Sequence, residues 1–574
     1  MGLPSARAAL RQWAERIKNR EDQLTVLLSL LIGVLVGLMV VAFILLTGRL
    51  AANMYPAGGA AWRRVVIPII GAGVSGYFLY RYFPNARGSG IPQTKFAIFI
   101  QDGYISMRTV FGKFMCCSAS LASGIALGRE GPSVQIGAGI ASVLGRKFGL
   151  SKASVKALVP VGCSAALAAA FNTPIAAVLF SLEEILGDLH APVLGTVVIS
   201  SATSWIVLHL LLGDEPLFHV PAYRLINPLE FGVYAVLGVV GGLGSVAFVK
   251  LLLGIRVWFM RLPKASQWIQ PAAGGLAVGL LGWFMPEVLG VGYDYVERVL
   301  GGDFPLKIVA MLAILKIIAT AMCYSSGNAG GIFGPSLFIG AMLGGTVGSV
   351  AHWLLPQQTA GPGVYALVGM GTAFAGIVRT PLTSVIMIFE LTRDYSIIVP
   401  LMISNLISFF ISYRLQREPI YEALAIQEGV YLPTGESRHE VEQMRVGDIM
   451  QNANSALPAD LDVATAQQRL DDMSHQSWPV GEANWLYGIV TTSELKEVES
   501  PASTLLNQVV NPADSFPYLY PDHPLSVALE RMGAASGDVL PVVSRANRRR
   551  LQGVITLADI LGAYGVAKQE AASQ

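Results

Sequence analysis

A short motif occurs twice in this chain, and both copies lie within long apolar stretches. Residues 128–138 read GREGPSVQIGA, and residues 331–341, which lie 203 positions later, read GIFGPSLFIGA. Seven of the eleven positions match, and the main difference replaces a charged pair by an apolar pair. A Gly-x-x-Gly-Pro-Ser run that opens an apolar segment predicts a helix start, because proline is tolerated in the first turn. Two such starts in apolar surroundings direct free N–H groups and positive dipole ends at a negative ligand.

The composition indicates that most of the chain lies in lipid. Of 574 residues, 53% are hydrophobic and 14% are charged, whereas soluble domains carry about 25% charged residues. The segment Leu24–Leu46 is long enough to span a bilayer and too long for a secretory signal peptide. Basic residues directly before it predict a cytoplasmic N-terminus. The net charge of +2 gives no indication of a nucleic-acid partner.

The internal repeat continues beyond the opening motif. Residues 171–183 (FNTPIAAVLFSLE) align with residues 378–390 (VRTPLTSVIMIFE) at an offset of 207. The two halves of the apolar region are therefore roughly 24–212 and 229–415. Short apolar segments interrupted by glycine and proline in matching places predict broken helices around a central transport site. The residues alone leave open whether the halves are parallel or inverted.

Polar segments flank the apolar region and divide the chain. Two C-terminal segments each join a short apolar strand to a helix start, as in GIVTTSEL and GVITLADI, which predicts a pair of β-α-β-β-α units. The predicted domains are a cytoplasmic amphipathic N-terminal helix (1–23), a transmembrane domain (24–415), a linker (416–444), the two related motifs (445–500 and 501–566) and a tail (567–574).

Four separated motifs resemble those of the CLC family of chloride channels and proton-coupled chloride transporters. In the family's order they are Gly88–Pro92 (GSGIP), Gly128–Pro132 (GREGP), Gly330–Pro335 (GGIFGP) and Tyr421, just after the last apolar span. The two C-terminal motifs resemble the CBS modules that many members carry. The resemblance implies an α-helical polytopic membrane protein with two inverted repeats of broken helices, a small α/β CBS pair in the cytoplasm, and a homodimer.

The resemblance also implies the residues of an anion site. Ser89 and Tyr421 match the two residues that donate hydroxyl groups to the anion, and Ile332 and Phe333 match those whose backbone N–H groups hold it. Serine at position 89 is similar to chloride-selecting members, and bromide or nitrate are further candidate ions. The family usually has glutamate where this chain has Gln93. An anion held by amides and hydroxyls, without a full positive charge, can leave again, as transport requires.

Two acids are implied in gating and proton transfer. A lone acid in hydrocarbon costs about 2.5–3.5 kcal/mol, so Glu130 needs a role. In the family the matching acid occupies the helix-start site when ionised and moves aside when protonated; the alternative is an ion pair with Arg129. Glu184 matches the internal proton-transfer acid, and Glu183 a structural one. Lys113 matches a basic residue that provides positive charge in the vestibule, the alternative being a lysine that reaches a membrane surface.

The CBS pair leaves two interpretations open. Thr556 and Asp559 match positions that hold the phosphate and ribose of an adenine nucleotide in nucleotide-binding CBS pairs. The first motif has Thr491 and Glu494 instead, which is a partial departure. A structural pair that supports dimerisation is an equal alternative, and no other cofactor is expected. The four cysteines lie in apolar stretches without C-x-x-C spacing, so no metal site is expected.

These observations favour a chloride transporter, with chloride/proton antiport preferred to a passive voltage- or pH-gated channel because of Glu184. CBS pairs also occur on cation transporters, but a divalent-cation pore needs several acids or carbonyl ends facing the ion. A simple membrane anchor needs one span, and no nucleophile–base pair indicates an enzyme. The expected location is the inner (cytoplasmic) membrane, with several crossings and both termini in the cytoplasm.

Overall fold

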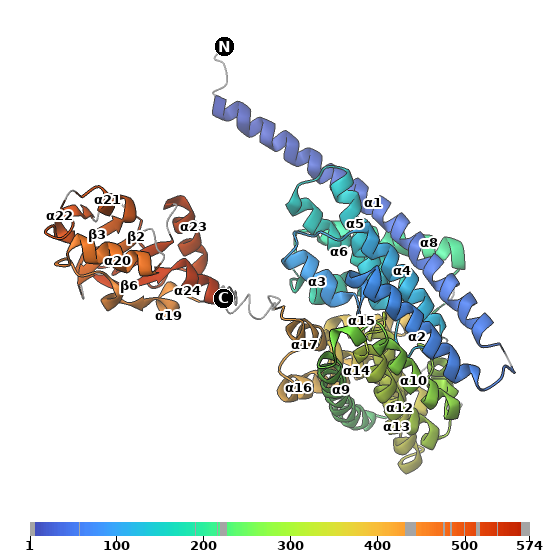
Figure 1. Cartoon of the computed structure of the whole chain (residues 1–574). Coiled ribbons are helices and arrows are strands. Elements are labelled where there is room, and N and C mark those ends of the chain that lie inside the picture. Colours follow the sequence, from blue (N-terminus) through green and yellow to red (C-terminus); the bar gives the residue numbers. More distant parts are fainter. Residues whose placement is uncertain are drawn as a thin grey trace. The chain divides into compact units, whose positions relative to one another are not determined.

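The computed structural model divides into two compact units, Met1–Leu432 and Pro433–Gln574 (Figure 1). The first unit is helical, and the second combines helices with small sheets. The predicted tail, 567–574, lies outside the described residues. The structure describes residues 6–56, 58–189, 191–214, 216–218, 227–302, 304–430, 444–473, 477–482, 485–498, 500–512, 517–535 and 538–563.

The helices of the first unit form two matching series, the first half (blue to teal in Figure 1) and the second half (green to ochre). The first half contains α1 (Ala6–Met54), α2 (Arg63–Arg81), α3 (Ile91–Phe99), α4 (Met107–Ala122), α5 (Glu130–Lys147), α6 (Lys152–Phe171), α7 (Pro174–Phe180), a π-helical turn (Ser181–Leu186) and α8 (Leu194–Leu212). The second half contains α9 (Glu230–Met260), α10 (Gln270–Phe284), α11 (Tyr293–Leu300), α12 (Leu306–Ser325), α13 (Phe333–Leu354), α14 (Pro362–Val378), α15 (Pro381–Thr392) and α16 (Ile398–Leu415). A further helix, α17 (Ile420–Gln427), follows.

Two boundaries differ from those predicted. The segment 1–23 does not form a helix of its own, because α1 continues to Met54 and no proline interrupts its 49 residues. The beginning of the predicted linker, 416–444, folds as α17. Ile420 and Leu424 of this helix are buried where it packs against α3 and α9, so it belongs to the membrane unit.

The helix lengths fit a membrane protein with broken helices. Seven helices within the described residues are long and apolar enough to cross a membrane, by length and composition. In contrast, α3 has 9 residues and α7 has 7, well below the roughly 20 that a crossing needs. Such helices begin or end inside the protein, where their terminal N–H or C=O groups need partners.

Each half contains the same close helix crossing. In the first half, α5 packs on α6 at Gly137 and Gly162, and in the second half α13 packs on α14 at Gly340 and Gly369. A Cβ atom at any of the four positions would collide with a backbone carbonyl of the neighbouring helix. Glycine is therefore required at these contacts, because backbone atoms cannot give way as a flexible side chain can.

Two glutamates join the halves by capping each other's helices. The carboxylate of Glu183, in the π-helical turn, accepts hydrogen bonds from the Thr383 backbone N–H at 2.8 Å and its hydroxyl at 2.6 Å, at the start of α15. Glu390, at the end of α15, accepts from the backbone N–H groups of Ile175 and Ala176 at 2.9 and 2.7 Å, at the start of α7. Each short helix thus has its free N–H groups satisfied by an acid from the other half.

The C-terminal unit consists of two small sheets with helices around them. Strand order is β1-β6-β5 in one sheet and β2-β3-β4 in the other, so the short first strand of each motif, β1 or β4, pairs with a strand of the other motif. All strand pairs within both sheets are antiparallel. The elements are α19 (Val446–Ile449), β1 (Gln451–Asn452), α20 (Val463–Met473), β2 (Ser477–Glu482), β3 (Trp485–Thr491), α21 (Thr492–Lys496), α22 (Leu506–Val509), β4 (Asn511–Pro512), α23 (Leu525–Ala535), β5 (Val539–Val543), β6 (Leu551–Thr556) and α24 (Leu557–Ala563).

The glycine crossing predicts a stability effect. We expect Gly340→Ala to lower the melting temperature of the protein in detergent, with a loss of about 1–3 kcal/mol, because the added methyl group meets backbone atoms of α14. Gly232→Ala on α9 is the matched control, since no atom lies within 4 Å of its Cβ position and alanine favours a helix. Equal melting temperatures for Gly340→Ala and the wild type would contradict this account of the crossing.

Candidate functional site

The two repeated motifs meet where their helices begin. The N–H of Gly128 donates to the carbonyl of Gly331 at 2.7 Å, and the N–H of Gly331 donates to the carbonyl of Gly128 at 2.7 Å. This antiparallel pair relates the two halves by a local twofold axis. Beyond it, α5 begins at Glu130 and α13 at Phe333, so the free N–H groups of both first turns converge on one region.

A third backbone segment reaches the same region. Gly90 directly precedes α3 and has a φ of +103°, a conformation that favours glycine. A Cβ atom on Gly90 would lie 2.5 Å from the carbonyl oxygen of Gly131, and one on Gly131 would lie 2.6 Å from that of Ser89. Glycine at both positions therefore allows Ser89 to lie beside the start of α5.

Two buried hydroxyl groups belong to this region. Ser89 and Tyr421 are 0% and 1% exposed, and neither hydroxyl oxygen makes a hydrogen bond to the described residues. The Tyr421 hydroxyl lies near the Ser89 side chain and close enough to Glu130 to be affected by its charge, which places it near the helix starts. Since buried hydroxyls are rarely left without partners, the pair suits a ligand that accepts hydrogen bonds, such as an anion.

Aromatic side chains close the space beside the start of α13. Ile332 and Phe333 are 0% and 1% exposed. Their apolar side chains cannot hydrogen-bond to an anion, so only the backbone N–H groups of this turn are available to one. The ring centroid of Phe333 lies 4.3, 4.6 and 5.5 Å from those of Phe374, Phe171 and Phe180.

The Glu130 carboxylate lies at the start of the opposite helix, α13. Its Oε2 accepts a hydrogen bond from the Gly334 N–H at 3.2 Å, and its Oε1 accepts one from the hydroxyl of Tyr293 on α11. Glu130 is 0% exposed. The structure shows no ion pair between Glu130 and Arg129, both of which it describes; the Arg129 guanidinium lies 5.7 Å from the centroid of the Tyr293 ring. The acid therefore occupies a place that suits an anion, at a helix N-terminus.

A buried lysine pairs with the second predicted acid, Glu184. Lys95 Nζ lies 2.9 Å from Oε1 of Glu184 and 3.7 Å from Oε1 of Glu422. The side chains of Lys95 and Glu184 are each 7% exposed. Lys95 lies on α3, which begins just after Ser89, and Glu422 follows Tyr421 on α17. The segments that carry the two buried hydroxyls therefore also carry the charged residues that surround the Glu184 carboxylate.

Lys113 lies behind the loop that carries Ser89. Its side chain is 0% exposed, so it does not reach a membrane surface. Its Nζ instead donates to the carbonyls of Ala86 and Gly88 at 3.0 and 2.6 Å, and so fixes the loop that presents Ser89. The physical reason is that the three donors of a buried ammonium group need acceptors, and the carbonyls of this loop provide two.

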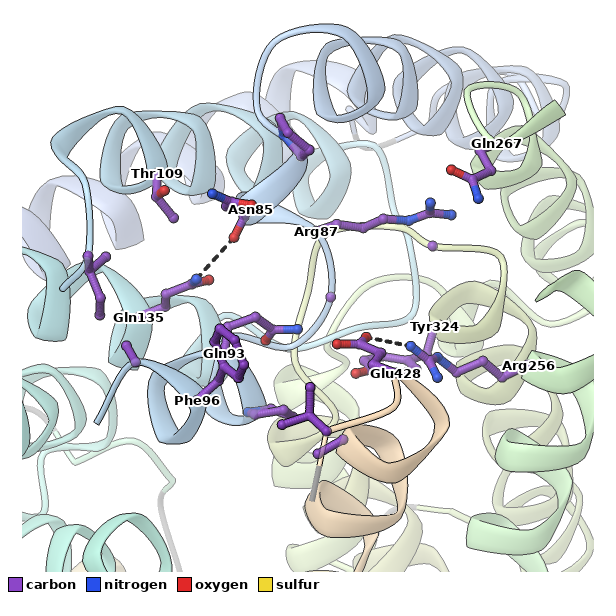
Figure 2. A pocket seen from close by; sticks show the side chains of 18 of the residues that line it. Asn85, Arg87, Gln93, Phe96, Thr109, Gln135, Arg256, Gln267, Tyr324 and Glu428 are labelled. Atoms are coloured by element: carbon purple, nitrogen blue, oxygen red, sulfur yellow. Dashed lines mark hydrogen bonds and ion pairs between the residues drawn. The ribbon is translucent and has the colours of Figure 1, made fainter. Parts of the chain in front are cut away.

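A cavity of about 690 Å³ lies next to Ser89, since Gly88 is part of its wall (Figure 2). Its lining comes from the loop before α3, from α3 itself, and from α9, α12 and the end of α17. Gln93, which stands where the family usually has glutamate, lines it and accepts a hydrogen bond from the Gly90 N–H at 2.9 Å. The cavity thus gives access to the loop that carries Ser89.

Positive charge predominates among the side chains that line this cavity. Arg256 pairs with Glu428 at 2.5 Å, and this leaves Arg87 as the second cation (Figure 2). Within the described residues, the Arg87 side chain makes no ion pair or hydrogen bond, and it packs against Gly327. A guanidinium at this wall attracts anions, since two arginines and one glutamate line the cavity.

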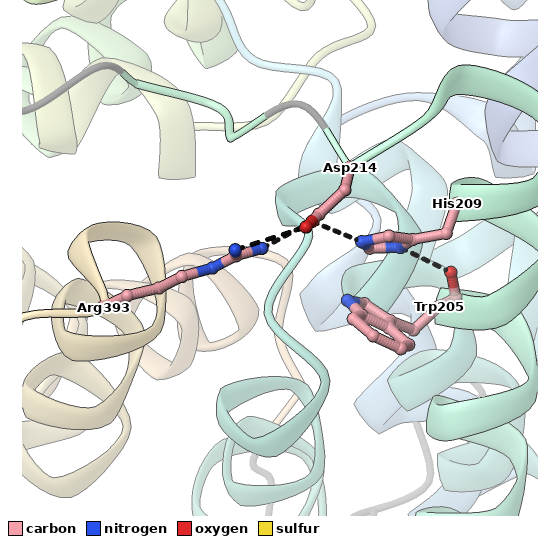
Figure 3. A network of polar contacts seen from close by, with 4 residues as sticks. All are labelled: Trp205, His209, Asp214 and Arg393. Carbon is pink, nitrogen blue, oxygen red and sulfur yellow. Dashed lines mark hydrogen bonds and ion pairs between the residues drawn. The ribbon is translucent and has the colours of Figure 1, made fainter.

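A separate polar network joins the halves away from the site (Figure 3). Asp214, after α8, lies 2.5 Å from Arg393, after α15, and 2.9 Å from Nε2 of His209. The other ring nitrogen of His209 lies 3.0 Å from the carbonyl of Trp205. The hydrogen bonds from Arg393 and His209 lower the pKa of Asp214 to about 2, so it stays ionised at neutral pH.

The C-terminal candidates occupy equivalent places in the two motifs. Asp559 accepts hydrogen bonds from the Thr556 N–H at 2.9 Å and hydroxyl at 2.8 Å, and from Gln451 at 3.0 Å. Glu494 accepts from the Thr491 N–H at 2.9 Å and hydroxyl at 2.9 Å. Each pair caps the helix that it begins, so both motifs use a threonine and an acid in the same local structure.

Sequence reasoning missed several residues of the site. Lys95 carried a usable signal, because a lysine in the apolar segment IPQTKFAIF needs a buried partner. Glu422 and Arg87 flank the predicted Tyr421 and Ser89 within two residues, but their side-chain directions are set by the tertiary structure. Tyr293 carried no signal, because a tyrosine at a helix start has many ordinary uses.

Comparison with known proteins identifies the membrane unit. The family described as voltage gated chloride channel matches residues 70–413, and the CBS domain family matches residues 508–565. The H(+)/Cl(−) exchange transporter ClcA of Vibrio campbellii is 33% identical over 356 residues, which cover 61% of this chain and 76% of the relative. The chain therefore belongs to the voltage-gated chloride channel family, also called the CLC family.

Solved structures agree with this fold. A slow cyanobacterial Cl−/H+ antiporter superposes with a TM-score of 0.66 at 25% identity, covering 70% of this chain and 97% of that one. A eukaryotic CLC transporter superposes with a TM-score of 0.63 at 21% identity, covering 94% of this chain and 98% of that one. The fold is thus that of CLC transporters, with broken helices in two repeats and a C-terminal CBS pair.

The buried Lys95 cluster predicts a loss of stability. We expect Lys95→Met to destabilise the protein by roughly 3–5 kcal/mol, because it leaves two carboxylates in a buried site without their cation. Adding Glu184→Gln should restore part of the loss. The measurement is the melting temperature in detergent.

Lys152→Met is the matched control for this prediction. The Lys152–Asp102 pair has a similar N–O distance, 3.0 Å, but its side chains are 85% and 62% exposed. Its loss should cost about 0–1 kcal/mol. Equal effects of the two lysine substitutions would show that the buried cluster is not held by its charges.

Proposed function

We propose that this protein exchanges chloride for protons across the membrane, as the names of its relatives state for those proteins. The observation that carries the proposal is the position of the Glu130 carboxylate, which binds the Gly334 N–H at the start of α13. An acid in this place competes with an anion while it is ionised and ceases to compete once it is protonated. Chloride and a proton would then use the same site in turn.

Chloride would pass from the cavity to the helix starts. Arg87 raises the local anion concentration at the cavity wall, because positive charge beside an aqueous opening attracts anions. Ser89 and Tyr421 then donate their hydroxyls, and the N–H groups of Ile332 and Phe333 hold the central ion. Binding by hydroxyls and amides alone is weak enough to permit release.

Protons would reach the site by way of Glu184. Phe180, four residues before Glu184, contributes a ring to the aromatic group around Phe333. The partner of Glu184, Lys95, balances the carboxylate charge while no proton is bound, so the acid can alternate between two states without a bare buried charge. Protonation of Glu130 from this side would free the anion site.

The protein acts as a transporter and not as an enzyme, and it forms a homodimer in the inner (cytoplasmic) membrane with both termini in the cytoplasm. Bromide and nitrate are further ions that it would carry. The competing function is a passive voltage- or pH-gated chloride channel, in which Glu130 gates the anion but no proton crosses.

A flux experiment decides between exchange and passive flow. In chloride-loaded vesicles that contain the purified protein, an outward chloride gradient should drive protons inward against their own gradient. Glu184→Val should retain chloride flux and lose proton flux, because valine cannot carry a proton. Glu130→Ala should retain chloride flux that no longer depends on pH, because no acid competes with the anion.

Two outcomes would contradict the proposal. Chloride flux without coupled proton flux in the wild type would identify a passive channel, and the role given to Glu184 would be wrong. Retention of coupling in Glu130→Ala would show that the acid at the start of α13 is not the shared site.

The C-terminal unit would bind an adenine nucleotide through Thr556 and Asp559. ATP, ADP or AMP should then raise the melting temperature of the full-length protein, because a ligand that binds only the folded state stabilises it. Asp559→Asn should abolish the increase, since it removes the charge and keeps the size. Glu494→Gln is the matched control in the other motif and should retain it. If no nucleotide changes the melting temperature, the CBS pair is structural.

A further inference from the structure

The start of α11 repeats the structure of the start of α3 on the other side of the site. Lys316, 203 positions after Lys113, donates through Nζ to the carbonyls of Val288 and Gly290 at 3.0 and 2.6 Å. The distances equal those from Lys113 to the loop before Ser89. Gly290 has a φ of +63°, as glycine readily adopts, and the loop then leads into α11. The second half thus presents a fixed loop where the first half presents its hydroxyl donor.

The first residue of α11, Tyr293, directs its hydroxyl at Glu130. The hydroxyl donates to Oε1, while the Gly334 N–H donates to Oε2 at 3.2 Å, so both carboxylate oxygens have a donor. The phenol ring packs edge-to-face on Phe218 at 5.4 Å, and the Arg129 guanidinium lies 5.7 Å from its centroid. Contacts on the ring therefore hold the donor in place.

We propose that Tyr293 is a positioning residue for the gate: its hydroxyl holds the ionised Glu130 carboxylate at the start of α13 and so sets the pH at which the anion site becomes free. The inference rests on the proposed function, because it gives a second residue to the step in which Glu130 leaves the site. It adds a donor from α11, an element that none of the sequence motifs includes.

The direction of the effect follows from the hydrogen bond. A phenol O–H bonds more strongly to a carboxylate than to a neutral carboxyl group, so the contact favours the ionised acid. Loss of the hydroxyl would leave the Gly334 N–H as the one remaining donor among the described contacts of the carboxylate. Glu130 would then take up a proton and leave the site at a higher pH.

The other charged or titratable groups near Glu130 do not reverse this direction. Arg129 lies beside it on the same element and near the Tyr293 ring. Tyr421 approaches from α17 and interacts electrostatically with Glu130. In the described part of the chain, α13 contributes the Gly334 backbone N–H to this contact. None of these groups is altered by removing the Tyr293 hydroxyl.

The test compares Tyr293→Phe with the wild type in chloride flux measured across a range of pH. We expect the pH of half-maximal flux to move to a more alkaline value, on the order of one pH unit, because one hydrogen bond to a charged group changes the protonation equilibrium by about tenfold. Tyr295→Phe, two residues along α11, is the matched control and should leave the profile unchanged. An unchanged profile in Tyr293→Phe would overturn the inference.

The same substitution in a Glu130→Ala background separates positioning from packing. If Tyr293 acts through the carboxylate, Tyr293→Phe should have no further effect once Glu130 is absent. An equal change in both backgrounds would mean that the tyrosine only packs α11, and the inference would fail. If Glu130→Ala itself keeps the wild-type pH dependence, the proposed gate fails as well, so the two failures are distinguishable.

Discussion

The site depends on the reciprocal backbone pair between Gly128 and Gly331. Its two hydrogen bonds of 2.7 Å lie two residues before the starts of α5 and α13 and fix these starts against each other. The N–H groups of the first helical turns lie beyond the pair, where the Gly334 N–H donates to Glu130. Because backbone atoms make the contact, the geometry tolerates the change from Arg-Glu to Ile-Phe in the following two residues. One half can therefore supply a protonatable acid and the other an apolar wall.

Charges inside the protein serve two distinct purposes. Lys113 and Lys316 donate to neutral carbonyls and hold loops in place. Lys95 instead faces the carboxylates of Glu184 and Glu422, so its cluster has more than one way to distribute charge. A fixed cation gives shape to the anion path, whereas a cation between two acids permits one of them to change state.

The sequence could predict helix starts but not all side-chain partners. The repeated glycine and proline pattern determines where α5 and α13 begin, and the resemblance located Ser89, Tyr421 and the two acids. The resemblance gives Lys113 a charge role in the vestibule but does not predict its carbonyl partners, which come from a loop 25 residues or more away in sequence. Tyr293 lies 163 positions from Glu130, and its direction follows from loop geometry that no local pattern encodes. No local pattern predicts the helix α17 for a similar reason, since a helix of eight residues is stabilised mainly by the helices it packs on.

The mutual capping by Glu183 and Glu390 bears on how the chain is made. A ribosome delivers the first half to the membrane while the residues that bond Glu183 are about 200 positions from being synthesised. Until then the acid and the N–H groups at the start of α7 have no partners in lipid, which is costly for both. The first half must therefore keep this edge near water or near the insertion machinery. This edge is buried only when the second half is inserted. The same step therefore completes the fold and closes the membrane core.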